Sequence, residues 1–150
     1  MNKLRKNRRK GFTLVEIIVV LVIIAILMAA LTPVMIGWIN EARAGAMGAE
    51  ARTCMMAVQA VAAENASKPT PIANTSFANL TGGKYDTLAG TATKDNLVAI
   101  IMDATDTNLV QGVYYKKGTA KTIRLYKSEI VETDVPAGTT IDGNTIYKKP

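Results

Sequence analysis

The sequence contains no histidine and a single cysteine, Cys54. Without imidazoles and with one thiol, it lacks the usual ligands of a zinc site and the Ser/His or Cys/His pairs of nucleophilic catalysis. One cysteine also excludes a disulfide within the chain, so any exported domain must be stable without that cross-link. The scattered Asp, Lys and Tyr residues form no group suited to acid–base catalysis. We therefore expect a protein that is not an enzyme and has no cofactor or metal site.

The excess of positive charge, a net charge of +6, comes from the first ten residues of the chain. Of the 18 lysines and arginines, six precede Phe12: Lys3, Arg5, Lys6, Arg8, Arg9 and Lys10. The other 12 basic residues face 12 acidic ones, so the charges from Phe12 onward sum to zero. Domains that bind nucleic acid usually carry a basic face. We therefore expect no nucleic-acid partner for the folded domain.

Charge is also nearly absent from residues 12–39, where Glu16 is the only charged side chain. A helix of this length would extend ~42 Å, which exceeds the ~30 Å hydrocarbon core of a bilayer. A cleaved secretory signal has a shorter apolar core of ~7–15 residues and then a small-residue cleavage site, and no good site of that type follows here. The basic residues before the segment predict a cytoplasmic N-terminus and a C-terminus outside the cell.

The junction between the basic and apolar segments is unusual for a plain membrane anchor. An acidic residue within a membrane span costs on the order of 3 kcal/mol, and less near its end. The sequence Gly11-Phe12-Thr13-Leu14-Val15-Glu16 resembles the type IV prepilin signal, and the resemblance extends from about Lys10 to Pro33. A plain anchor is the alternative, with Gly11 as a linker and Glu16 reaching back to the membrane surface.

The resemblance implies specific roles for these residues. A membrane aspartic peptidase, the prepilin peptidase, would cut between Gly11 and Phe12 and methylate the new amine of Phe12. Glu16 would pair with the N-terminal amine of a neighbouring subunit during assembly. The other implied partners are copies of the same chain in a helical filament, membrane lipid before assembly, and an inner-membrane assembly platform with its ATPase. Pro33 matches the typical proline of this helix, and Pro33 and Gly37 are expected to kink it.

Helical spacing continues beyond the apolar segment. Apolar residues recur every three or four positions at Met47, Ala51, Met55, Val58 and Ala62. The pattern predicts one helix over residues 12–65, which the prolines at positions 69 and 71 would end. A loop-rich stretch is expected up to about residue 93. Three N-glycosylation patterns occur here: one at Asn65, just before this stretch, and two within it, at Asn74 and Asn79. We interpret them as loop composition.

The last third of the chain changes to the period of β-strands. Leu97, Ile100 and Ile101 still have helical spacing and predict a short helix over residues 95–102. Residues 110–116 and 121–127 predict a β-hairpin, with a third strand from 129–132 or 139–147 and a turn at Asp142-Gly143. Three polar residues, Asp103, Asp106 and Asn108, lack the glycine and distal glutamate of a calcium loop, so a surface turn is the better interpretation.

These patterns predict an α+β fold in which a long N-terminal helix, membrane-spanning in its first half, packs on a small antiparallel sheet. The expected parts are a cleaved cytoplasmic leader (1–11), the helix (12–65) and an exported globular domain (66–150). The resemblance implies a structural subunit of a type IV pilus-like extracellular filament. A pseudopilin of a type II secretion or DNA-uptake machine, and a membrane-anchored binding module, remain as alternatives.

Overall fold

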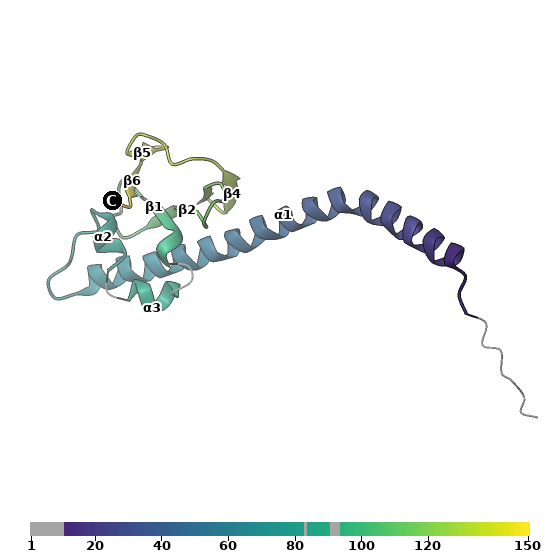
Figure 1. Ribbon diagram of the computed structural model, residues 1–150. Helices are drawn as coiled ribbons and strands as arrows, with labels where there is room; N and C mark the ends of the chain where they lie inside the picture. Colours follow the sequence, from purple (N-terminus) through teal and green to yellow (C-terminus); the bar gives the residue numbers. More distant parts are fainter. Residues whose placement is uncertain (1–10, 83, 91–93) are drawn as a thin grey trace, which may run out of the picture. The chain divides into compact units, whose positions relative to one another are not determined.

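The computed structural model describes residues 11–82, 84–90 and 94–150 (Figure 1). The chain divides into two units, Met1–Ala42 and Arg43–Pro150. The first holds the beginning of helix α1 (Leu14–Ser67), and the second holds the rest of α1 and the β-sheet. Apart from Gly11, the leader expected from the sequence lies outside the described residues.

Helix α1 has 54 residues, which confirms the expected long N-terminal helix. All of its large apolar side chains up to Ile39, with Phe12 just before it, are 41–85% exposed. An 18-residue stretch of α1 reaches a mean hydropathy of 3.2, so it is long and apolar enough to cross a membrane. Because no described residue of the first unit covers these side chains, they need a lipid or protein environment from elsewhere.

The second half of α1 forms one wall of the main core. Met47, Ala51, Val58 and Ala62 are buried as their spacing predicts, and Cys54 is buried with them. Met55 is only partly buried and packs at the edge of this cluster. The helix ends at Ser67, whose hydroxyl donates a hydrogen bond to the carbonyl of Ala63 (2.7 Å), two residues before the first of the prolines.

In the part of the chain that the structure describes, the sheet has six antiparallel strands in the order β4-β3-β2-β1-β6-β5. Their bounds are β1 Leu97–Met102, β2 Val110–Tyr115, β3 Ile123–Tyr126, β4 Glu129–Glu132, β5 Thr140–Ile141 and β6 Asn144–Lys148. Strands β2 and β3 form the predicted hairpin, and both candidates for a third strand contribute strands. Asp142 and Gly143 have φ values of 46° and 82°, as a tight hairpin turn requires.

The prediction of a short helix over residues 95–102 was wrong. A single 3₁₀ turn, Lys94–Asn96, leads directly into strand β1. This strand lies in the middle of the sheet, with Ile100 buried against the α1 side and Ile101 buried on the other side. A strand buried on both faces has an uninterrupted apolar sequence, which does not show the alternation of a half-exposed strand.

Two short helices interrupt the stretch expected to be loop, α2 (Phe77–Leu80) and α3 (Tyr85–Ala89). The Ser76 side chain caps α2 by accepting a hydrogen bond from the backbone N–H of Asn79 (3.2 Å). Leu80 and Tyr85 from these helices are buried in the α1 core. The opposite face of the sheet has its own small cluster, to which Val135 and Ile141 contribute from the segment before β6.

Candidate processing and assembly site

The expected cleavage site lies just before the first turn of α1. Gly11, Phe12 and Thr13 have no regular secondary structure, and all three are exposed. A Cβ atom added at Gly11 would meet nothing within 4 Å beyond its chain neighbours. The bond between Gly11 and Phe12 is therefore open to a peptidase, and the fold of this unit gives no steric reason for a glycine at position 11.

Glu16 forms a capping box with Thr13 at the start of α1. The Glu16 carboxylate oxygen Oε2 accepts hydrogen bonds from the Thr13 backbone N–H (2.8 Å) and from the Thr13 hydroxyl (2.8 Å). In return, the Thr13 hydroxyl oxygen accepts a hydrogen bond from the Glu16 backbone N–H (3.2 Å). These bonds satisfy two backbone donors that the first turn of a helix otherwise leaves without partners.

This role of Thr13 was not predicted from the sequence. A threonine followed three residues later by a glutamate, directly before an apolar run, is the sequence pattern of a capping box. The structure therefore gives Glu16 a local function in starting the helix. Any test of its expected role between subunits has to separate these two functions.

Pro33 and Gly37 lie further along α1, within its continuous helical span. Pro33 has no N–H and leaves the carbonyl four residues earlier without its helical donor. Beside it, the Thr32 hydroxyl donates a hydrogen bond to the Met28 carbonyl (2.7 Å), a contact that often accompanies bending. A Cβ atom added at Gly37 would contact nothing within 4 Å. The expected kink at these two residues stays a prediction.

A comparison with protein families matches residues 6–32 to the prokaryotic N-terminal methylation motif. This range contains the capping box and the Gly11–Phe12 bond. The chain carries a prepilin-type signal. The signal supports a type IV pilin-like or pseudopilin-like protein, and the apolar helix behind it fits membrane anchoring. Proteins with this motif are structural rather than enzymatic, and the motif implies processing by a prepilin peptidase and assembly into a pilus. Searches of curated proteins and of solved structures gave no match.

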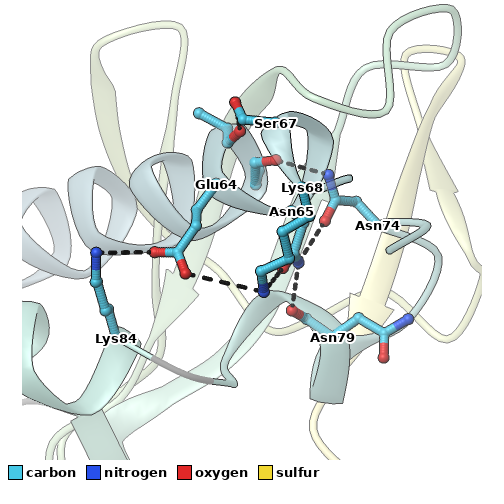
Figure 2. A network of polar contacts seen from close by, with 9 residues as sticks. Glu64, Asn65, Ser67, Lys68, Asn74, Asn79 and Lys84 are labelled. Carbon is cyan, nitrogen blue, oxygen red and sulfur yellow. Dashed lines mark hydrogen bonds and ion pairs between the residues drawn. The ribbon is translucent and has the colours of Figure 1, made fainter. Parts of the chain in front are cut away.

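The three asparagines of the N-glycosylation patterns meet in a network at the end of α1 (Figure 2). The Asn65 side-chain amide donates hydrogen bonds to the Asn74 side-chain oxygen and the Asn79 carbonyl, both at 2.9 Å. Asn74 is 1% exposed and donates to the Ala62 carbonyl and the Asn108 side chain, both at 3.1 Å. The side-chain nitrogens of Asn65 and Asn74, which a glycan would modify, are therefore used inside the fold, whereas that of Asn79 donates to the Ala73 carbonyl in an exposed bond (2.7 Å). The contacts of Asn65 and Asn74 support a structural interpretation of these two residues.

The turn between β1 and β2 is stabilised by hydrogen bonds to one of its own acidic side chains, Asp103. Asp103 accepts hydrogen bonds from the backbone and hydroxyl of Thr105, from the backbone of Asp106 and from the side chain of Gln111. These bonds, those from Thr105 above all, lower the pKa of Asp103 to about 2. The arrangement is that of a surface turn, as the sequence predicts. Among the described residues, no three His, Cys, Asp or Glu side chains are grouped to hold a metal ion.

Proposed function

We propose that this protein is a structural subunit of a type IV pilus-like extracellular filament and that it is made as a membrane-inserted prepilin. The observation that carries the proposal is the prepilin-type signal placed directly at the start of an exposed apolar helix. The sheet unit at the other end of the chain supports it, because it provides a separate folded part for the surface of a filament.

In this proposal, α1 first anchors the precursor, with its basic leader in the cytoplasm and the sheet unit outside. Prepilin peptidase then removes residues 1–11 and methylates the amine of Phe12. An assembly platform and its ATPase move the mature chain out of the bilayer. The exposed side chains of residues 17–39 then exchange lipid for the helices of other copies, so that the apolar surface never meets water.

Glu16 gives each incoming copy a defined position in this proposal. Its carboxylate lies among packed apolar helices, where an unpaired charge is costly. The positively charged amine of a neighbour's Phe12 can neutralise it. One oxygen of the carboxylate, Oε2, is held by Thr13, which would fix the orientation of the group before the neighbour arrives.

Immunogold labelling of intact cells with an antibody to residues 66–150 tests the proposal. We expect labelled fibres that extend from the cell surface. Labelling confined to short structures at the envelope would instead favour the pseudopilin, and label spread evenly over the membrane would favour an anchored binding module. The strain must make its own prepilin peptidase, because uncut precursor would stay in the membrane in every case.

A further inference from the structure

A groove of about 590 Å³ runs along the second half of α1 beside strand β3, within the unit Arg43–Pro150. Leu125 of β3 lines the groove and is buried. Two methionines, Met55 and Met56, line its side, and Met56 is 66% exposed. Ala60 and Ala63 continue the helix side of the groove with small side chains. A large exposed methionine beside a mostly apolar groove is typical of a surface that a partner covers.

The polar side chains that line this groove are Gln59, Arg52 and Ser128, of which Arg52 and Ser128 are exposed. The Gln59 side chain donates a hydrogen bond to the Asn108 carbonyl (2.7 Å) and accepts one from the Val110 backbone N–H (2.8 Å). Both the nitrogen and the oxygen of the Gln59 amide are therefore hydrogen-bonded within the unit. Arg52 is the one charged lining residue, and its long exposed side chain can keep the guanidinium in water. An apolar occupant would therefore leave neither the Gln59 amide nor the Arg52 charge buried without a partner.

We propose that this groove receives the apolar segment, residues 17–39, of another copy of the chain. The inference rests on the proposed filament function and names one contact between its subunits. The segment and the groove match in charge, because residues 17–39 have no charged side chain and Arg52 lies at the groove as its only charge. A basic partner surface would instead meet the like charge of Arg52 and lose hydration against Leu125 and the methionines.

The shape of the groove also suits a helix. Ala60 and Ala63 allow another helix to approach closely, and the flexible methionines can fill the irregular space between its side chains. In a filament of identical copies, the same contact would repeat from one copy to the next.

Photo-crosslinking in assembled filaments tests this contact. Benzoylphenylalanine replaces Met56 in the full-length chain, the filaments are sheared from cells and irradiated, and the joined peptides are identified by mass spectrometry. We expect crosslinks from position 56 to residues 17–39 of another copy. The control carries the same group in place of Leu88, a half-exposed residue of α3 that does not line the groove, and should not give these crosslinks.

A pair of substitutions gives an independent readout. Met56→Glu places a charge in the groove and should lower the yield of sheared filaments at least fivefold, whereas Met56→Leu should keep the yield of wild type. Because Met56 is mostly exposed, both variants should keep the wild-type level of mature protein and its melting temperature in detergent.

Three results would overturn the proposal while leaving the filament function intact: a normal yield from Met56→Glu, no crosslink between copies, or crosslinks from position 56 to residues 43–150 of another copy. If the wild-type chain forms no filaments at all, both the groove contact and the proposed function fail together.

Discussion

Gly112 occupies a position of β2 where the neighbouring strand leaves no room for a side chain. A Cβ atom there would collide with the Leu125 carbonyl oxygen and lie 3.1 Å from the Tyr126 Cα, both in the backbone of β3. Because backbone atoms cannot rotate away, we expect Gly112→Ala to destabilise the sheet unit by about 1–3 kcal/mol. Chemical denaturation of the mature chain in detergent measures this loss.

Gly45 provides the matched control for that substitution. It lies in α1, where an added Cβ would meet nothing within 4 Å. Gly45→Ala should stabilise the helix by up to about 1 kcal/mol, because alanine loses less backbone freedom on folding. Equal effects of the two substitutions would show that the close approach of β3 does not decide the need for Gly112.

The two functions of Glu16 can be separated by substitution. Gln at this position keeps the capping box but loses the charge, whereas Thr13→Ala removes the cap and keeps the carboxylate. If Glu16 pairs with a neighbour's amine, Glu16→Gln and Glu16→Ala should both be cut normally but lower filament yield at least tenfold. Immunoblots of sheared filaments beside total mature protein measure this. Wild-type yield from Glu16→Gln would assign Glu16 to the cap alone.

The candidate site could be predicted from the sequence because its residues are neighbours in the chain. Gly11, Phe12 and Glu16 lie within one short segment, so no tertiary fold was needed to bring them together. The asparagine network could not be predicted, because its residues are not neighbours in the chain. Asn65 meets Asn74, and Asn74 meets Asn108, only after the chain has folded, and isolated asparagines far apart in sequence look like loop residues.

The helices and strands that could be predicted from the sequence are those with a regular spacing of apolar residues. The second half of α1 and the β2–β3 hairpin show their periods clearly, and both formed as expected. Strand β1 was not predicted as a strand, because the residues that bury it come from elements before and after it in the chain. Its two buried faces remove the alternation by which a strand is recognised.

Helix α1 and strand β2 are joined by a polar contact that should respond to pH. The Glu50 carboxylate accepts hydrogen bonds from the Lys117 ammonium and the Tyr115 hydroxyl, both at 2.5 Å. These bonds, that from Lys117 first, lower the pKa of Glu50 below its ordinary value of 4.5. Their stabilisation is therefore complete above that value and is lost as the pH falls through the lowered pKa.

We expect the melting temperature of the mature chain to fall as the pH is lowered from about 5 to about 3, and to fall less in Glu50→Gln. At neutral pH, Glu50→Gln should cost about 1 kcal/mol. Glu132→Gln is the control, because the ion pair of Glu132 with Lys121 is exposed and such pairs contribute little. The role of Glu50 is excluded if wild type and Glu50→Gln lose the same stability over this range.

The second half of α1 should be indispensable for folding of the sheet. It contributes nine buried residues, and the 85 residues that would remain after Asn65 bury little surface alone. A fragment of residues 41–150 should therefore be soluble, monomeric and cooperatively folded, whereas residues 66–150 should not fold. Thermal unfolding followed by circular dichroism compares them. An equally sharp transition in the shorter fragment would mean that the helix is not part of the core.

At the scale of the whole molecule, processing decides whether the chain follows the prepilin route. The Gly11–Phe12 bond is exposed in a segment without regular structure, immediately before the capped start of α1. We expect the stable form in cells with an active prepilin peptidase to begin at Phe12 and to carry one added methyl group. Intact-mass measurement on membranes and on filaments reads both changes at once.

Gly11 gives the matched test of that cleavage. An added Cβ atom at position 11 meets no atom within 4 Å and the residue is exposed, so Gly11→Leu should leave the structure of the chain unchanged. Any loss of processing then reflects the peptidase and not a folding defect. We expect Gly11→Leu to accumulate in the membrane as uncut precursor and to be absent from filaments, whereas Thr13→Ala should still be cut. Full-length precursor as the stable wild-type form would contradict the prepilin route, and the plain membrane anchor would then be the better account of residues 12–39.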